Sequence, residues 1–186
     1  MTAADDLPVR VLLLPGWLNS GPTHWQSRWE ELFGHRRVEQ GDWIWPKRGD
    51  WMARLEAVLL EARAPAVLVA HSLGCQLVAA WAAHSGHTAR VKAALLVAPP
   101  DTERDVMPPQ LHNWRPIVRR RLPFASLVVS SSDDPFASAE RAAAMATDWG
   151  SDSASIGVHG HINGDSGLGD WPEGQAMLQA LIGLTG

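Results

Sequence analysis

Three segments of the chain carry a hydroxyl, a carboxylate and an imidazole, in that order. Residues 70–74 read Ala-His-Ser-Leu-Gly, residues 130–135 contain Asp133 and Asp134, and residues 159–164 contain His159 and His161. A serine hydroxyl is a poor nucleophile at neutral pH and needs an imidazole within hydrogen-bond reach, which in turn needs a carboxylate to fix its tautomer. The three residue types together therefore indicate nucleophilic attack on an acyl carbon.

The segment around Ser72 is typical of a sharp turn between a strand and a helix. The backbone of the serine is strained in such a turn, so the residues two positions away on either side must be small, as Ala70 and Gly74 are. The helix that follows stabilises negative charge near the hydroxyl. We expect His71 to be packed or hydrogen-bonded rather than to act as the base, because adjacent residues in a sharp turn point apart. We expect Cys75 to be a small core residue rather than a nucleophile.

Each of the three segments directly follows an expected strand, and the order Ser, Asp, His is that of the α/β-hydrolase triad. The residues alone leave two choices open, Asp133 or Asp134 and His159 or His161. His159 and His161 with Asp133 or Asp134 are also residue types that bind metals, but no third convincing ligand accompanies them. No metal and no cofactor are therefore expected.

The loop after the first strand is expected to complete the site. In this fold that loop supplies one oxyanion amide and the residue after the nucleophile supplies the other, which here are the backbone N–H groups of Trp17 and Leu73. Gly16 lets the loop pass close to the serine. Substrate-pocket positions are expected at Gly16, His24, Trp45 and Asn163, although a structural role for His24 is an equal alternative.

The elements that must position these groups follow from the apolar pattern. Continuously apolar strands are buried on both faces, and strand–helix alternation predicts a parallel sheet covered by helices on both sides. The expected strands are 9–14, 37–40, 66–70, 93–98, 127–129 and 153–158. Five helices are expected. The first begins with a capping box at Thr23 and Gln26, the second is capped by Asp50, and the third follows Ser72. The fourth is capped by Ser138, and the fifth begins at Pro172. The prediction is a three-layer α/β-hydrolase fold with a six-stranded sheet of order 2-1-3-4-5-6.

Composition narrows the function classes. Sixteen Lys and Arg residues against 20 Asp and Glu give a net charge of −4, so no basic surplus favours a nucleic-acid partner. The single cysteine excludes an internal disulfide framework. The segment Met1–Asp6 has no apolar core and is not a secretory signal, and no apolar run is long enough to cross a bilayer. We expect one cytoplasmic domain spanning residues 1–186, without a membrane partner.

The chain resembles the small serine hydrolases of the retinoblastoma-binding protein nine and YdeN type, a lidless branch of the α/β hydrolases. The stretches that carry the resemblance run nearly end to end and include PGWLNSGPTHWQSRWE, VLVAHSLGCQLVA, SSSDDPF and GHINGDSGLGDWPEG. The resemblance implies a triad of Ser72, Asp134 and His161, because the family places its acid directly before Pro135 and its histidine in the GHIN motif. It also implies hydrolysis of carboxylic esters.

Two other functions are alternatives to a small-molecule esterase. A binding-only protein is disfavoured because the triad residues are intact, and because the stretch 73–77 lacks the glutamate of the L-x-C-x-E segments that dock on the retinoblastoma pocket. A thioesterase or acyltransferase would share the chemistry up to the acyl-enzyme. A protein partner is left undetermined.

Residues 99–124 have room for one short helix at 111–118 but not for a lid domain. We therefore expect little apolar area to hold a long acyl chain, and a preference for acyl groups of roughly two to four carbons.

Overall fold

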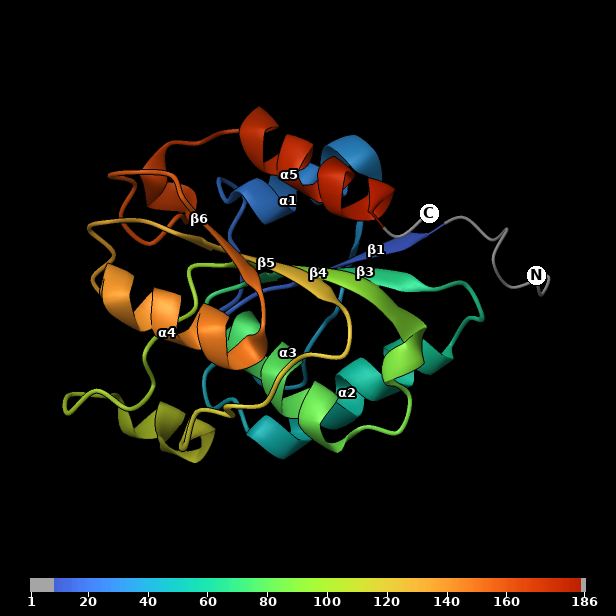
Figure 1. Cartoon of the computed structure of the whole chain (residues 1–186), viewed down its shortest axis with the longest axis horizontal. Coiled ribbons are helices and arrows are strands. Elements are labelled where there is room, and N and C mark those ends of the chain that lie inside the picture. The colour runs from blue at the N-terminus through green and yellow to red at the C-terminus, as the bar shows by residue number, and fades with distance from the viewer. Residues whose placement is uncertain (1–8, 185–186) are drawn as a thin grey trace.

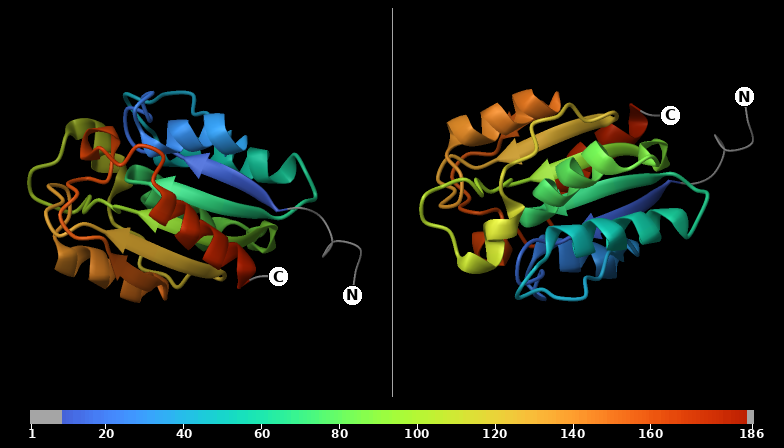
Figure 2. Two further views of the ribbon diagram at one scale, coloured as in Figure 1. Left: turned by 90° about the horizontal axis from the view of Figure 1, so that it is seen from above. Right: turned by 90° about the horizontal axis from the view of Figure 1, so that it is seen from below.

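The computed structural model describes residues 9–184, so the acidic segment Met1–Asp6 lies outside the described residues. Six parallel strands form one sheet in the order β2-β1-β3-β4-β5-β6, which confirms the predicted order (Figure 1). The strands are β1 (Arg10–Leu14), β2 (Arg36–Arg37), β3 (Ala66–His71), β4 (Val91–Val97), β5 (Ala125–Ser130) and β6 (Asp152–Ser155). Their carboxyl ends all point to one end of the sheet (Figure 2). Any side chain that follows a strand is thereby brought to this end.

Helices cover both faces of the sheet, as predicted (Figure 1). One face is packed by α2 (Arg48–Leu60), α3 (Leu73–His84) and α4 (Ala139–Trp149), and the other by α1 (Trp25–Phe33) and α5 (Pro172–Gly183). Successive residues of a strand point to opposite faces, so Leu68 and Ala70 join the first core and Val67 and Val69 the second. Continuously apolar strands are what such a double-sided core requires.

No lid domain is present within residues 9–184. Between β4 and β5 the chain forms one short 3-10 helix, η2 (Pro109–Trp114), which overlaps the stretch 111–118 where room for one short helix was expected. None of the helices in this described part of the chain is long and apolar enough to cross a membrane.

Buried indoles attach loops to the core. Seven of the ten tryptophans are almost completely buried. Indole N–H groups donate to loop carbonyls, in the pairs Trp25–Ile162, Trp29–Asp170, Trp51–Asp42, Trp114–Pro46 and Trp149–Val118. A buried indole N–H needs an acceptor, so each of these rings fixes a loop as well as filling the core.

The predicted capping box at the start of α1 is wrong. The N-cap is His24, whose Nδ1 accepts the backbone N–H of Gln26 at 3.1 Å, and Thr23 precedes the cap. The Gln26 side chain is completely buried and donates instead to the carbonyl oxygens of Leu14 and Val69. The side-chain oxygen of Gln26, which a capping box would use to accept a backbone N–H, accepts the hydroxyl of Ser20 at 2.7 Å instead.

Of the other predicted helix caps, one is confirmed and one is wrong. Ser138 caps α4, as predicted, and Gly150 ends this helix in the left-handed conformation. Asp50 is not a cap, because α2 begins two residues earlier and its N-cap is Lys47. The last strand is also shorter than predicted and lies at the sheet edge, with mostly exposed residues.

Candidate active site

Ser72 occupies a strained turn between β3 and α3. Its backbone has φ 54° and ψ −124°, a left-handed conformation that a side-chain-bearing residue rarely adopts. Close packing explains the small neighbours: a β-carbon at position 74 would collide with the carbonyl oxygen of Leu14. A β-carbon at Gly16 would lie 2.7 Å from the β-carbon of Ser72, so the loop after β1 passes directly against the serine.

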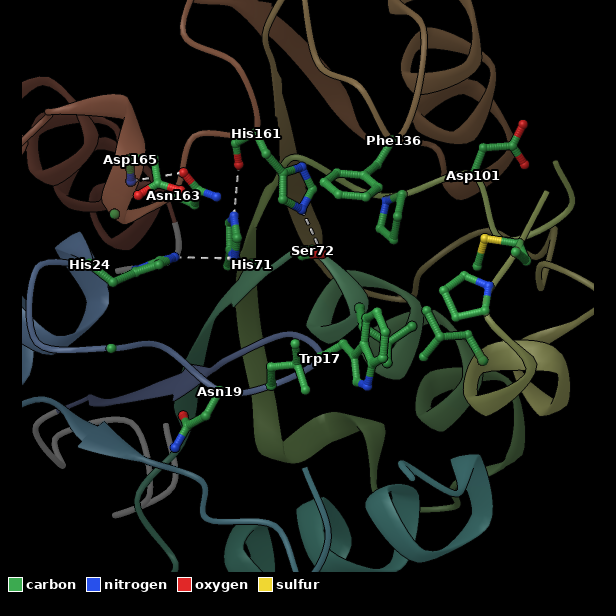
Figure 3. A pocket seen from close by; sticks show the side chains of 18 of the residues that line it. Trp17, Asn19, His24, His71, Ser72, Asp101, Phe136, His161, Asn163 and Asp165 are labelled. Carbon is green, nitrogen blue, oxygen red and sulfur yellow. Dashed lines mark hydrogen bonds between the residues drawn. The ribbon is translucent and has the colours of Figure 1, made fainter. Parts of the chain in front are cut away.

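The side chains of Ser72, His161 and Asp134 form one hydrogen-bonded chain. The Nε2 atom of His161 lies 2.8 Å from Oγ of Ser72, and its Nδ1 lies 2.9 and 3.0 Å from the two carboxylate oxygens of Asp134 (Figure 3). The side chains of His161 and Asp134 are only 10% and 4% exposed. A neutral imidazole with its proton on Nδ1, held by the carboxylate, presents a free lone pair on Nε2 to the hydroxyl. The arrangement can accept the hydroxyl proton as the serine oxygen attacks.

Asp133 and His159 lie nearby but have different contacts. The Oδ1 atom of Asp133 accepts the hydroxyl of Ser131 at 2.7 Å and the backbone N–H of Gly160 at 2.8 Å. These hydrogen bonds, that of Ser131 foremost, lower the pKa of the Asp133 carboxyl. The described hydrogen bonds of His159 run through its backbone, to Ser131 and Ser166 among others. Within residues 9–184 no three His, Cys, Asp or Glu side chains are grouped so that they could hold a metal ion.

The two expected oxyanion donors border the same cavity as Ser72. Trp17 and Leu73 both line it, and Leu73 is the first residue of α3. Within the described part of the chain, no hydrogen bond uses the backbone N–H of either residue. The two donors are thus available to an oxygen atom bound beside the serine.

A cavity of about 600 Å³ opens above Ser72 (Figure 3). One wall is apolar and is formed by Pro100, Val106, Met107, Pro108, Leu111 and Phe136. The opposite wall is polar and is formed by Asn19, Thr23, His24, Asn163 and Asp165. The expectation of little apolar area is therefore wrong, because the segment between β4 and β5 contributes an apolar wall without forming a lid domain.

Three of the expected pocket positions lie at or beside this cavity, and one does not. His24 and Asn163 line it, and Gly16 lies directly behind Ser72. Trp45 is not among its lining residues and is 53% exposed. Its neighbour Ile44 instead accepts the indole N–H of Trp17 through its carbonyl oxygen at 2.9 Å.

Phe136 was not anticipated from the sequence. Its ring stands edge to face against the imidazole of His161, with centroids 4.5 Å apart. The only signal is its place two residues after Asp134, whose Oδ1 also accepts the Phe136 backbone N–H at 2.8 Å. This turn brings the carboxylate and the aromatic ring to the same imidazole.

Cys75 is completely buried in the first turn of α3, as expected of a core residue. Burial raises the pKa of its thiol well above the usual value. A buried thiol of raised pKa holds its proton and is a poor nucleophile.

A comparison with protein families places these observations in context. Residues 11–180 match the model of the serine hydrolase family. The chain belongs to this serine hydrolase family. No curated protein matches this serine hydrolase in sequence.

Solved structures resemble the serine hydrolase over almost its whole length. A YdeN-like hydrolase from Pectobacterium atrosepticum is 28% identical, with a TM-score of 0.84 over 95% of this chain and 92% of the other. The ydeN gene product of B. subtilis is 18% identical, with a TM-score of 0.72 over 95% and 100%. The esterase domain of a Rhodothermus marinus protein is 17% identical, with a TM-score of 0.66 over 95% and 88%. The first similarity supports the YdeN-type resemblance, and the last two show the α/β-hydrolase fold.

The buried His24 at the start of α1 is expected to make the stability of this serine hydrolase depend on pH. Burial, with lesser contributions from the charges of Arg37 and His161, lowers the pKa of His24 from 6.5 to about 3. Between these values the unfolded chain binds a proton that the folded chain does not. The free energy of unfolding is therefore expected to fall by about 1 kcal/mol per pH unit as the pH drops below about 6.5, and to be insensitive to this group above it.

Urea unfolding at pH 7, 6 and 5 measures this dependence. The slope with pH should become shallower in His24→Leu, whereas replacement of His112 at the protein surface by leucine should keep the wild-type slope. An unchanged slope in His24→Leu would contradict the assignment of this proton to His24.

Proposed function

We propose that this serine hydrolase is a carboxylesterase-type enzyme that cleaves small carboxylic esters with a triad of Ser72, His161 and Asp134. The observation that carries the proposal is the hydrogen-bonded chain of these three side chains, with 2.8 Å between Ser72 Oγ and His161 Nε2, at the base of a cavity of about 600 Å³. A hydroxyl so aligned with a base is activated for attack.

Acylation begins when Ser72 Oγ attacks the ester carbonyl and its proton passes to Nε2 of His161. The carbonyl oxygen becomes an oxyanion, and the backbone N–H groups of Trp17 and Leu73 stabilise it. Asp134 holds the imidazole in the required tautomer and stabilises the imidazolium. The tetrahedral intermediate then expels the alkoxide of the leaving alcohol, which takes the proton from Nε2, and an acyl-enzyme is formed on Ser72.

Deacylation repeats the same steps with water. His161 removes a proton from a water molecule as it attacks the acyl-enzyme, and the same two N–H groups stabilise the second oxyanion. Collapse of this intermediate releases the carboxylic acid, and the proton returns from His161 to Ser72. No side chain beyond the triad has to change its charge.

The substrate is proposed to be a small ester because of the shape and surface of the cavity. Its volume is in the range of pockets that hold small organic molecules. The apolar wall is largely open to solvent at its rim, since Val106 is 79% exposed and Phe136 is 45% exposed. A long acyl chain that passes this rim would leave its outer methylenes in water, where they add nothing to binding.

A series of p-nitrophenyl esters tests this proposal. We expect kcat/KM to be higher for acyl chains of about two to four carbons than for chains of eight or more, because each methylene that is buried contributes at most about 0.8 kcal/mol and one left in water contributes nothing. A steady rise from acetate to decanoate would contradict the preference for small esters. Hydrolysis of thioesters of the same acids at much higher kcat/KM would instead favour a thioesterase.

A further inference from the structure

The residues on both sides of His161 have left-handed backbone conformations, and one of them is strained. Gly160 has φ 52° and Ile162 has φ 48°, both in the left-handed region. Glycine adopts this conformation freely, but isoleucine is β-branched and does so at a cost. A strained residue persists only where its surroundings fix it. Ile162 is completely buried, so its conformation must be fixed by contacts from other elements.

Two ring N–H groups from distant elements hold the carbonyl groups of this segment. The Nε2 atom of His71 lies 2.9 Å from the carbonyl oxygen of His161, and the indole N–H of Trp25 donates to the carbonyl oxygen of Ile162 at 2.8 Å. A carbonyl oxygen only accepts, so the proton of His71 is on Nε2. His71 and Trp25 are 5% and 1% exposed, and both hydrogen bonds are therefore shielded from water.

His24 completes a chain of hydrogen bonds that runs in one direction. Its Nδ1 accepts the N–H of Gln26, so its single proton is on Nε2, which lies 3.3 Å from Nδ1 of His71 (Figure 3). His24 thus donates to His71, and His71 donates to His161. Burial is the main cause that lowers the pKa of both His24 and His71, so both rings stay neutral and keep this pattern at neutral pH.

We propose that His71 and Trp25 are positioning residues that hold the backbone of His161 in register with Ser72, and that His24 acts through His71 by fixing its tautomer. The proposal rests on the proposed function, since it assigns a purpose to the alignment of Ser72 with His161. His71 directly precedes Ser72 in sequence, so its bond to a carbonyl 90 residues away ties the turn of the nucleophile to the loop of the base.

The variants remove or restore single donors. His71→Leu and Trp25→Phe each remove a ring N–H and keep an apolar side chain in the core. His71→Gln offers an amide N–H at about the distance of Nε2. His84→Leu is the matched control, because the His84 ring is also within hydrogen-bond distance of a backbone carbonyl, that of Ala80, but is not among the residues that line the cavity.

Turnover of a short p-nitrophenyl ester and the rate at which a fluorophosphonate labels Ser72 are measured for each variant. We expect His71→Leu to lower kcat about 10- to 100-fold with KM changed less than about twofold, and to slow labelling by the same factor, because a misplacement of about 1 Å costs up to about 10²-fold. Trp25→Phe should act in the same direction, His71→Gln should recover most of the loss, and His84→Leu should have wild-type kinetics.

The dependence of His24 on His71 is tested by a double-mutant cycle. If His24 acts only through His71, the double variant His24→Leu/His71→Leu should be no slower than His71→Leu alone. Independent, multiplying losses would overturn the role assigned to His24. Should His71→Leu fail to fold, Trp25→Phe and His71→Gln decide the proposal. A wild-type kcat in folded Trp25→Phe, together with a kcat about 10- to 100-fold below wild type in folded His71→Gln, would overturn it.

The outcomes also separate this proposal from the proposed function. If the wild-type protein is not labelled on Ser72, the proposed function fails. If the wild type is labelled on Ser72 and folded His71→Leu is labelled at the same rate, only the positioning role fails. A change confined to KM in His71→Leu would likewise overturn it, because a displaced base slows the chemical step.

Discussion

Ser72→Ala is expected to lower kcat for ester hydrolysis by about 10⁴ or more and to abolish labelling by a fluorophosphonate probe. The substitution removes one oxygen atom, the one that lies 2.8 Å from Nε2 of His161. Alanine meets the same backbone strain at φ 54° as serine does, so the turn and the helix after it should form normally. The loss then reflects the missing nucleophile, since the oxyanion donors and the cavity are unchanged.

Labelling followed by peptide mapping measures this result directly. Ser85→Ala is the matched control: it is the same substitution at the opposite end of α3, where the hydroxyl donates to Glu56. The control should keep wild-type kinetics and labelling. Labelling that persists in Ser72→Ala, or that moves to Cys75, would contradict the assignment of the nucleophile.

The sheet could be predicted from sequence because its signal is local. Each buried strand that a helix follows, such as β1 or β3, contains a continuous apolar run that ends at a turn signal, and the helix after it has buried apolar residues of its own. The strand order was expected from the α/β-hydrolase fold, which the chain order of Ser, Asp and His indicates. The edge strand β6 was placed less well, because an exposed strand with polar residues lacks the apolar run that marks the others.

The site was predictable where a strand end fixes it and unpredictable where distant groups meet. Ser72 follows β3, and the strand fixes its place at one end of the sheet. Trp45 was expected at the cavity, yet nothing local to residue 45 specifies that the loop carries it to the outer surface. The bonds from Trp25 and His71 to the loop of His161 span 137 and 90 residues, and no local pattern reports such pairs. For the same reason, the sequence leaves both a substrate contact and a structural role open for His24.

Asp134→Asn is expected to lower kcat by about 10⁴, while Asp133→Asn is expected to cost little. Both carboxylate oxygens of Asp134 lie within 3.0 Å of Nδ1 of His161. An asparagine there can direct its amide N–H at Nδ1, which favours the tautomer with the proton on Nε2. That tautomer cannot take the proton of Ser72.

Asp133 provides a control next to Asp134 in the chain, because its contacts require only an acceptor. Its Oδ1 accepts from Ser131 and from Gly160, and the side-chain oxygen of asparagine can accept both hydrogen bonds. A moderate decrease in stability with near-normal kcat is therefore expected for Asp133→Asn, since hydrogen bonds to a charged acceptor are stronger than those to a neutral one. Kinetics of the two purified variants on the same ester, with thermal unfolding of each, distinguish the roles. If Asp133→Asn proved the more damaging to kcat, the carboxylate that orients His161 would have been assigned to the wrong residue.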